Sequence, residues 1–267
     1  MKNDDILNQM SNKGPAYTDA KPVPGQDLDA AVLTSFKSIV AARRSIRIFD
    51  GVALPEKTME SILADTTLSP SSSNLQPWEF YWIRDPEKKQ AAAEACLGQP
   101  AAKTAGDLLA LVARPDLWDT NRLKLIDIMT QGGKAELPKP VNIYYKKLIP
   151  RLMATDPFGV QNLFRRILFS VLGLTKVMVR SPKNKGDHRV WAHTQVALAA
   201  QTLMLSIAAH GYDSCPMGGF DEVRMKKILN LPRGAEVTMM MAVGNRKPEG
   251  LYGPQIRLPQ ADVVHKV

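Results

Sequence analysis

A polar loop, Ser69-Pro70-Ser71-Ser72-Ser73-Asn74-Leu75-Gln76-Pro77-Trp78, joins an expected helix to an expected aromatic strand. Its four serines, one Asn and one Gln offer many hydrogen-bond donors and acceptors, and its two prolines stiffen the backbone. Such a loop can hold a polar heterocycle through hydroxyl and amide groups. A polar connector is the alternative interpretation, although a large aromatic residue such as Trp78 is unexpected in a simple linker.

The segments around this loop predict many helices and few strands. Apolar residues at helical spacing, together with capping signals, predict helices at Asp29 to Ala42, from Pro55 onward, at Pro86 to Cys96, at 160–172, at His188 to His210 with Gly211 as the C-cap, and at Asp221 to Leu229. Strands are expected at Phe80 to Ile83, Asp107 to Ala113 and Glu236 to Val243. Because helices and strands do not alternate strictly, we expect an α+β fold rather than a doubly wound sheet.

The composition is that of a globular chain. With 267 residues, of which 45% are hydrophobic and 23% charged, the chain can bury a substantial core. Residues 1–27 are polar and are expected to form a flexible N-terminal arm. A single domain should follow over 28–267, with its least regular part in an insert at about 114–187.

Cysteine usage and the chain start favour a cytoplasmic protein. Cys96 and Cys215 are too few to staple a domain of this size, and they match no metal-site spacing, so no metal is expected. The first residues lack the basic and apolar parts of a secretory signal. No stretch reaches the roughly 18 apolar residues of a membrane span.

The net charge of +9 is concentrated in one stretch. Residues 141–186 hold nine Lys or Arg and a single Asp, a local balance of +8. Because the rest of the chain is close to neutral, we expect no nucleic acid partner and one basic patch for an anionic cofactor, a nucleotide or a membrane surface. The insert is interpreted as a lid that attracts nucleotide phosphates, as a helix for peripheral membrane contact, or as a packed helix with snorkelling basic side chains.

Two further segments suit a nucleotide-like ligand. Arg43-Arg44-Ser45-Ile46-Arg47 offers three guanidiniums and a hydroxyl to a phosphate, and in an extended backbone Arg43, Ser45 and Arg47 share one face. Cys215-Pro216-Met217-Gly218-Gly219-Phe220-Asp221 leads into a helix, and its paired glycines let the backbone come close to a flat ligand. Taken singly, a solvated basic turn and a simple capped turn are the alternative interpretations.

These segments, in this order, resemble the nitroreductase family of flavoproteins. The family patterns R-R-S-x-R-x-F, P-S-S-x-N-x-Q-P-W-x-F, P-M-x-G-F-D and R-x-P correspond to Arg43 to Phe49, Pro70 to Phe80, Pro216 to Asp221 and Arg257-Leu258-Pro259. The resemblance spans roughly Ala30 to Val264 and is weakest over 114–187. It implies a nitroreductase-like α+β fold, with a central, mainly antiparallel sheet flanked by helices, and a homodimer.

The resemblance also implies an FMN site. On the phosphate and pyrimidine side it assigns Arg43, Arg44, Ser45 and Arg47, with Arg47 near the pyrimidine edge and Arg257 closing the phosphate site. Gln255 stands where many relatives have Lys, which removes one phosphate charge.

On the ring side, Gly218 and Gly219 would lie against the flavin, and Gln99 aligns loosely with a family Asn or Gln that faces it. Gly218 replaces a Glu of many relatives, which leaves substrate choice more open. Ser71, Ser72 and Asn74 would reach the flavin from the second subunit, because family sites form at the dimer interface.

No side-chain pair suits a general base or nucleophile. The histidines at 188, 193, 210 and 265 are scattered, as expected where a cofactor performs the hydride chemistry. The resemblance implies ping-pong electron transfer from NADH or NADPH, through FMN, to an electron-poor small molecule such as a nitroaromatic, a quinone or an enone, with Arg47 as electrostatic stabiliser. The alternatives are reductive dehalogenation or flavin cleavage on the same fold, a non-catalytic flavin-binding protein, and an adaptor that uses only the basic patch.

Overall fold

The computed structural model describes residues 29–154 and 184–267, together with the isolated residues 174, 175, 177 and 182. The expected helix at 160–172 and the expected arm at 1–27 lie outside the described residues. The division into an arm and one domain over 28–267 therefore stays a prediction.

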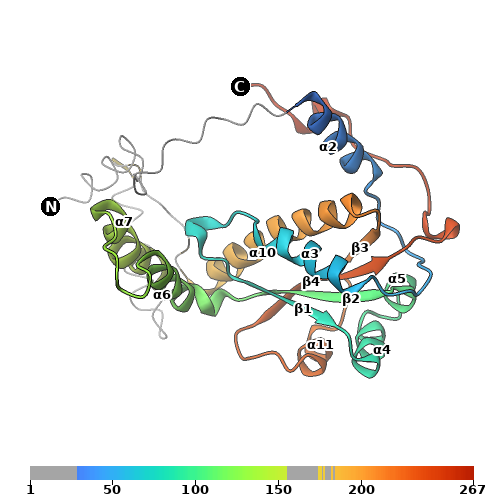
Figure 1. Ribbon diagram of the computed structural model, residues 1–267, viewed down its shortest axis with the longest axis horizontal. Coiled ribbons are helices and arrows are strands. Elements are labelled where there is room, and N and C mark those ends of the chain that lie inside the picture. The colour runs from blue at the N-terminus through green and yellow to red at the C-terminus, as the bar shows by residue number, and fades with distance from the viewer. Residues whose placement is uncertain (1–28, 155–173, 176, 178–181, 183) are drawn as a thin grey trace.

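A four-stranded antiparallel sheet forms the centre of the molecule (Figure 1). Its strands are β1 (Trp78–Ile83), β2 (Asp107–Ala113), β3 (Asp213–Met217) and β4 (Glu236–Gly244), in the spatial order β1-β2-β4-β3. Every adjacent pair is antiparallel. This arrangement confirms the α+β class with a mainly antiparallel sheet.

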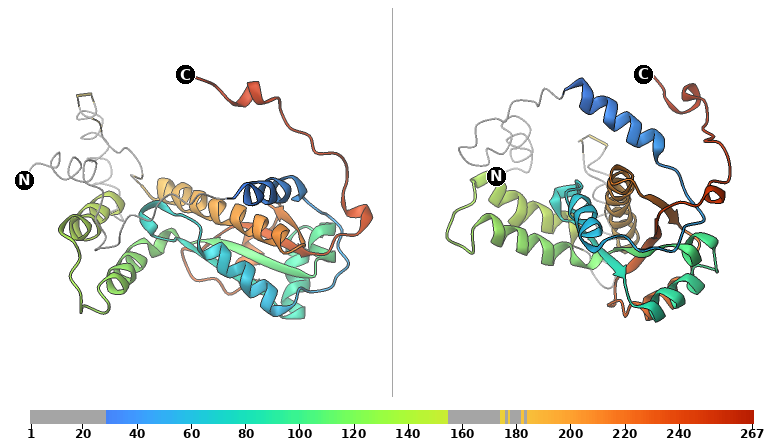
Figure 2. Two further views of the ribbon diagram at one scale, coloured as in Figure 1. Left: turned by 45° about the horizontal axis from the view of Figure 1, so that its top comes forward. Right: turned by 45° about the vertical axis from the view of Figure 1, so that its right-hand side comes forward.

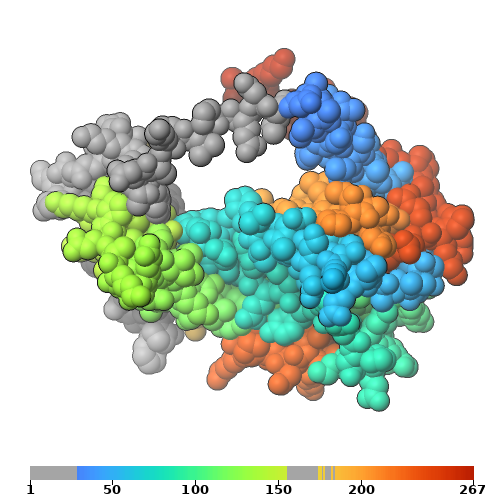
Figure 3. All heavy atoms as spheres, in the orientation of Figure 1, coloured from blue at the N-terminus to red at the C-terminus, as the bar shows by residue number. Residues whose placement is uncertain are grey.

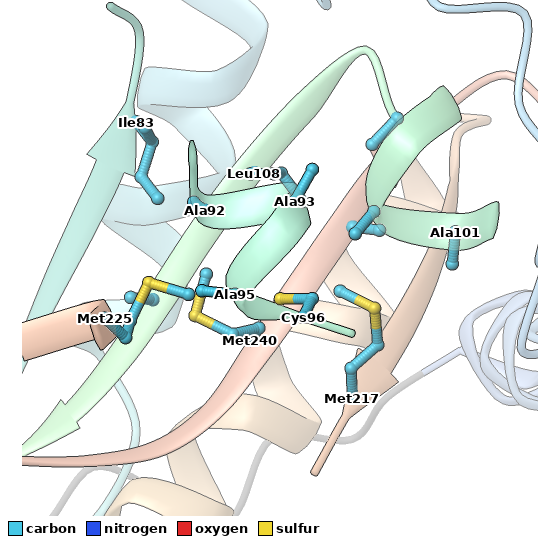
Figure 4. Packing of buried hydrophobic residues seen from close by; sticks show 14 of the residues in the cluster. Ile83, Ala92, Ala93, Ala95, Cys96, Ala101, Leu108, Met217, Met225 and Met240 are labelled. Atoms are coloured by element: carbon cyan, nitrogen blue, oxygen red, sulfur yellow. The ribbon is translucent and has the colours of Figure 1, made fainter. Parts of the chain in front are cut away.

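Both faces of the sheet are covered by helices (Figures 1 and 2). Alternate β2 residues point to opposite faces, so Leu108 and Ala110 belong to one core cluster and Leu109 and Leu111 to another. The first cluster lies against α4 (Pro86–Ala95), α5 (Pro100–Thr104) and α11 (Glu222–Ile228), where Figure 4 shows Cys96, Met225 and Met240 packed together. The second lies against α3 (Glu56–Thr67) and α10 (Lys185–Ala209). All seven β2 residues are buried, so this strand fixes a three-layer architecture.

Four of the described α-helices begin at a residue whose side chain caps the first turn. Asp85 and Asp221 accept hydrogen bonds from backbone N–H groups at the starts of α4 and α11, as their side chains suit them to do. Asn184 caps α10 in the same way, and this helix therefore begins three residues before the predicted His188. The predicted strand at Phe80 to Ile83 also begins earlier, at Trp78.

Helix α2 (Ala30–Ala42) begins after the N-cap Asp29, as predicted, but none of its residues is buried. Leu33 and Phe36 on its apolar side are 54% and 53% exposed. Figure 3 shows α2 in blue projecting from the body beside the start of the chain's C-terminal part. Residues 251–267, which include α12 (Gln260–Val263), are exposed as well. An amphipathic helix without a buried face in one chain has an apolar surface left to cover.

The prediction that 114–187 is least regular is wrong for 115–153, which is mostly helical. This part contains the 3-10 turn η2 (Pro115–Leu117), α6 (Trp118–Met129), α7 (Lys139–Ile143), the π-helix η3 (Tyr144–Leu148) and α8 (Ile149–Met153). Pro140 is the second residue of α7, in the first turn, where the N–H has no intrahelical partner. Pro150 is the second residue of α8, which follows η3 directly.

Strand β3 was not predicted from the sequence, where its residues were assigned to a turn. The strand is short and contains Pro216, which lacks a backbone N–H. Proline is tolerated here because β3 is an edge strand whose only neighbour in the sheet is β4. Two 3-10 turns complete the described structure, η1 (Ser72–Asn74) and η4 (Pro248–Gly250). Among the described residues, no helix has the length and apolarity to cross a membrane.

Gly106 lies against the backbone of Val52, and this close approach gives a stability prediction. A Cβ at Gly106 would lie 1.9 Å from the carbonyl oxygen of Val52, so the backbone must move in a Gly106→Ala variant. We expect a loss of more than about 2 kcal/mol in the free energy of unfolding, measured by urea denaturation. Gly253→Ala is the matched control, because a Cβ there meets no atom within 4 Å. Equal stability of the two variants would contradict the packing described.

Candidate functional site

Residues 43–49 run as an extended segment along the outer edge of β3. The N–H of Ile46 donates to the carbonyl of Ser214 at 3.1 Å, and the N–H of Arg47 donates to the carbonyl of Gly250 at 2.9 Å. Ile46 is fully buried, so the alternate residues Ser45 and Arg47 face away from the core. The extended backbone thus gives Ser45 and Arg47 the shared face that the sequence predicts.

Beside this segment lies a pocket of about 390 Å³ that four guanidiniums line. They belong to Arg43, Arg44, Arg47 and Arg257. Arg44 and Arg257 each donate to a nearby backbone carbonyl at 2.6 Å, that of Gly253 and that of Ile256. Within the described part of the chain, none of the four is in an ion pair with a carboxylate, and no Asp or Glu lines the pocket. Four converging cations without a protein counter-charge favour an anionic ligand.

A second pocket, of about 210 Å³, adjoins the first. Ser45, Arg47 and Tyr252 line both pockets. The remaining wall of the second pocket comes from the start of α5 and from β3 with the residue after it, and consists of Gln99, Pro100, Ala101, Cys215, Pro216, Met217 and Gly218. Because only one arginine lines the second pocket, a ligand with an anionic end and an uncharged body fits the two pockets together.

Gln99 connects the two walls of the second pocket. Its Nε2 donates to the carbonyl of Gly219 at 2.6 Å and to that of Cys96 at 3.0 Å. An added Cβ at Gly218 would meet no atom within 4 Å, so the backbone at this turn borders open space. Gln99 therefore holds the glycine turn in place, and a ligand can approach the Gly218 backbone closely.

The charge of Arg47 reaches into the second pocket. Burial raises the pKa of the Cys215 thiol, and the nearby Arg47 guanidinium opposes this shift. The Arg47 guanidinium carbon also lies 5.1 Å from the ring centroid of Tyr252. Tyr252 was not predicted as a site residue, because it lies in none of the sequence motifs.

The polar loop lies elsewhere in the chain. Its Ser72 N–H donates to Oε1 of Gln195 in α10 at 2.8 Å. Gln195 is fourteen residues before Ala209, where α10 ends and the chain turns toward β3. At about 1.5 Å per helical residue, this places the loop roughly 20 Å along α10 from that end. Ser71, Ser72 and Asn74 line neither pocket.

The backbone of this loop is strained. Ser73, Asn74 and Gln76 have φ values of 55°, 53° and 45°, in the left-handed region that favours glycine. Each such residue costs on the order of 1–3 kcal/mol unless its surroundings compensate. A strained, polar loop at one end of the molecule is therefore held for a reason other than its own stability.

One chain thus gathers most of the predicted site residues but not all of them. Those that line the two pockets are Arg43, Arg44, Ser45, Arg47, Gln99, Gly218 and Arg257, and Gly219 contacts Gln99 beside them. The serines of the loop and Asn74 stand apart, in accordance with the expectation that they serve a second copy. The histidines at 193 and 210 contact other residues, Glu236 and Thr238 for the first and Ser206 for the second.

Known proteins resemble this chain in fold and in sequence. The chain matches the model of the family described as Nitroreductase family over residues 40–245. It is 31% identical over 228 residues to the NADH dehydrogenase of Thermus thermophilus, which covers 85% of this chain and 94% of that protein. The crystal structure of YdfN from Bacillus subtilis superimposes with a TM-score of 0.69 at 23% identity, covering 88% of this chain and 100% of that one.

A second solved structure, of a protein from Exiguobacterium sibiricum in complex with FMN, superimposes with a TM-score of 0.60 at 24% identity. The match covers 87% of this chain and 97% of that one. These two structures share the fold, and the family model and the Thermus relative extend the likeness to the sequence over most of its length. The chain belongs to the nitroreductase family.

Proposed function

We propose that the protein is an FMN-dependent oxidoreductase that takes electrons from NADH or NADPH and passes them to an electron-poor small molecule. Membership of the nitroreductase family supports an NAD(P)H-dependent flavin enzyme. The name of the Thermus relative includes NADH, and the Exiguobacterium structure holds FMN. Nitroaromatics, quinones and enones are the acceptor classes that suit an open flavin pocket.

The observation that carries this proposal is the group of four arginines that line the first pocket and that, among the described residues, form no ion pair with a carboxylate, beside a second pocket that only one of them lines. FMN combines a dianionic phosphate with a flat ring system. The phosphate suits the arginine-lined first pocket, and the ring would occupy the second. Arg43, Arg44 and Arg257 would bind the phosphate through charge-assisted hydrogen bonds, and the hydroxyl of Ser45 would add a donor. Gln255, which also lines the first pocket, contributes no charge.

The ring would lie in the second pocket. Arg47 lines both pockets, so its fixed positive charge can stabilise negative charge at the pyrimidine edge of the ring. The backbone at Gly218 and Gly219 can approach the ring because no side chain intervenes. Gln99 holds this turn through the Gly219 carbonyl.

FMN, when bound, supplies the hydride and electron-transfer chemistry, which is why the protein needs no acid–base pair of its own. The chain would position and polarise the cofactor, and the open face of the bound ring would accept one planar partner at a time. Nicotinamide and acceptor would use this face in turn, so we propose ping-pong turnover.

We further propose that two copies of the chain build two shared sites. The polar loop is too far from the arginines of its own chain to share a ligand with them, so Ser71, Ser72 and Asn74 would serve the site of the other copy. The apolar side of α2, where Leu33 and Phe36 are about half exposed, would be covered in such a dimer. The role of the basic insert beyond its described helices stays a prediction.

Purified protein should be yellow and should lose its flavin absorbance when NADH or NADPH is added without oxygen. Steady-state rates with varied donor and acceptor should give parallel double-reciprocal lines, because the two substrates would share one space. Bound flavin that neither nucleotide reduces would favour a non-catalytic flavin-binding protein. Intersecting lines would exclude ping-pong turnover, and a colourless protein without affinity for FMN would contradict the whole proposal.

Mixed dimers test the shared site. Arg47→Ala and Asn74→Ala homodimers should each bind FMN at least about tenfold more weakly, since each lacks a polar contact in both sites. A dimer with one chain of each kind keeps one complete site, made of the wild-type Arg47 of one chain and the wild-type Asn74 of the other. We expect one tightly bound FMN per mixed dimer, measured by titration after purification with two affinity tags. If each site lay within one chain, the mixed dimer would have no tight site.

A further inference from the structure

The polar loop is held by the helices of the insert. Leu75 is 1% exposed and packs in a cluster with Val141, Tyr145, Ile149 and Met153, which come from α7, η3 and α8. The loop therefore inserts Leu75 into the insert's own core. In Figures 1 and 2 the green helices α6 and α7 lie at the end of the molecule opposite α4 and α5.

Three polar side chains of the insert form hydrogen bonds to the loop from Ser73 to Gln76, two of them to its backbone. The hydroxyl of Tyr145 donates to the carbonyl of Ser73 at 3.0 Å, and the hydroxyls of Tyr144 and Ser73 are 2.6 Å apart. The Nδ2 of Asn121 in α6 donates to the carbonyls of Leu75 and Gln76 at 3.0 and 3.1 Å. These contacts fall on the residues whose φ is positive, or on their neighbours.

The π-helix η3 places both tyrosines toward the loop. Tyr144 and Tyr145 are consecutive in sequence, and their rings meet edge to face with centroids 5.3 Å apart. Arg122, a buried residue of α6, donates to the carbonyl of Tyr145 at 3.0 Å and so holds η3 against α6. The tyrosine hydroxyls are therefore fixed before any ligand arrives.

We infer that Tyr144, Tyr145 and Asn121 are positioning residues that keep the loop in its ligand-binding conformation and thereby set the FMN affinity of the partner copy's site. The inference rests on the proposed function, because it requires that Ser71, Ser72 and Asn74 reach the other copy's flavin. None of the three positioning residues lines either pocket of its own chain. Without them the strained backbone relaxes, and FMN must bind the small fraction of molecules in which the loop is still correctly shaped.

The insert then has a task that differs from covering the site. A helix that only covers a pocket changes which acceptors enter and how fast they leave. Residues that order a binding loop change cofactor affinity instead, and leave turnover intact once the cofactor is saturating. The two roles predict different kinetic parameters, so they can be separated.

The test compares two matched substitutions in the full-length protein stripped of FMN. Tyr145→Phe removes the 3.0 Å hydrogen bond to Ser73 and keeps the ring in its apolar cluster. Tyr81→Phe removes a 3.0 Å hydrogen bond to Glu79 in β1, which is not part of the loop or of either pocket. FMN affinity is measured by fluorescence titration, thermal unfolding is followed for both variants, and kcat is measured at saturating FMN.

We expect Tyr145→Phe to raise the Kd for FMN about fivefold and the Tyr144→Phe/Tyr145→Phe double variant at least about tenfold. Asn121→Leu should act in the same direction. Tyr81→Phe should leave the Kd within about twofold of the wild type. At saturating FMN, kcat should be that of the wild type in every variant.

Suppose that the wild type binds FMN and that Asn74→Ala weakens this binding. An unchanged Kd for FMN in the double variant would then overturn the inference while leaving the proposed function intact. An equal rise in Kd for Tyr81→Phe would also overturn it, because the effect would then be general destabilisation. If the wild type binds no FMN, or if Asn74→Ala binds as tightly as the wild type, the proposed shared site fails and the inference fails with it.

Discussion

The candidate site depends on the pairing of residues 45–47 with two segments, the free edge of β3 at Ser214 and the end of η4 at Gly250. The hydrogen bonds to Ser214 and Gly250 hold this segment extended, and the buried Ile46 fixes which side chains face outward. A Cβ at Gly250 would lie 2.4 Å from the carbonyl of Ile48, so the approach of these two segments requires glycine. Because the pairing brings the sequence around Arg43 beside that around Arg257, four guanidiniums meet that are far apart in the chain.

In the proposed dimer, the two ends of the molecule would carry complementary halves of one site. The cationic pocket and the glycine turn lie at the end where α10 leads into β3, and the polar loop lies about 20 Å back along α10, as the rise of a helix requires. The exposed apolar side of α2 is a surface that a second copy would cover in this proposal.

Local chemistry made much of this fold predictable. Asp29, Asp85 and Asp221 stand directly before predicted helices that the structure contains, and the apolar run of β2 predicts a buried strand. What could not be predicted depends on contacts distant in sequence. The strand β3 exists because β4 pairs with it, although Pro216 argues against a strand, and η3 owes its place to Arg122 and Leu75. Single motifs were ambiguous for the same reason, because spacing alone does not show that Arg44 and Arg257 face one pocket.

The central claim is that Arg43, Arg44 and Arg257 bind the phosphate of FMN. The most direct measurement compares the affinity of the flavin-free protein for FMN with its affinity for riboflavin, which has the same ring but no phosphate. Charge-assisted contacts from several arginines predict binding of FMN at least about a hundredfold tighter than riboflavin, with a difference that shrinks as salt increases. Equal affinity for the two flavins would contradict the account.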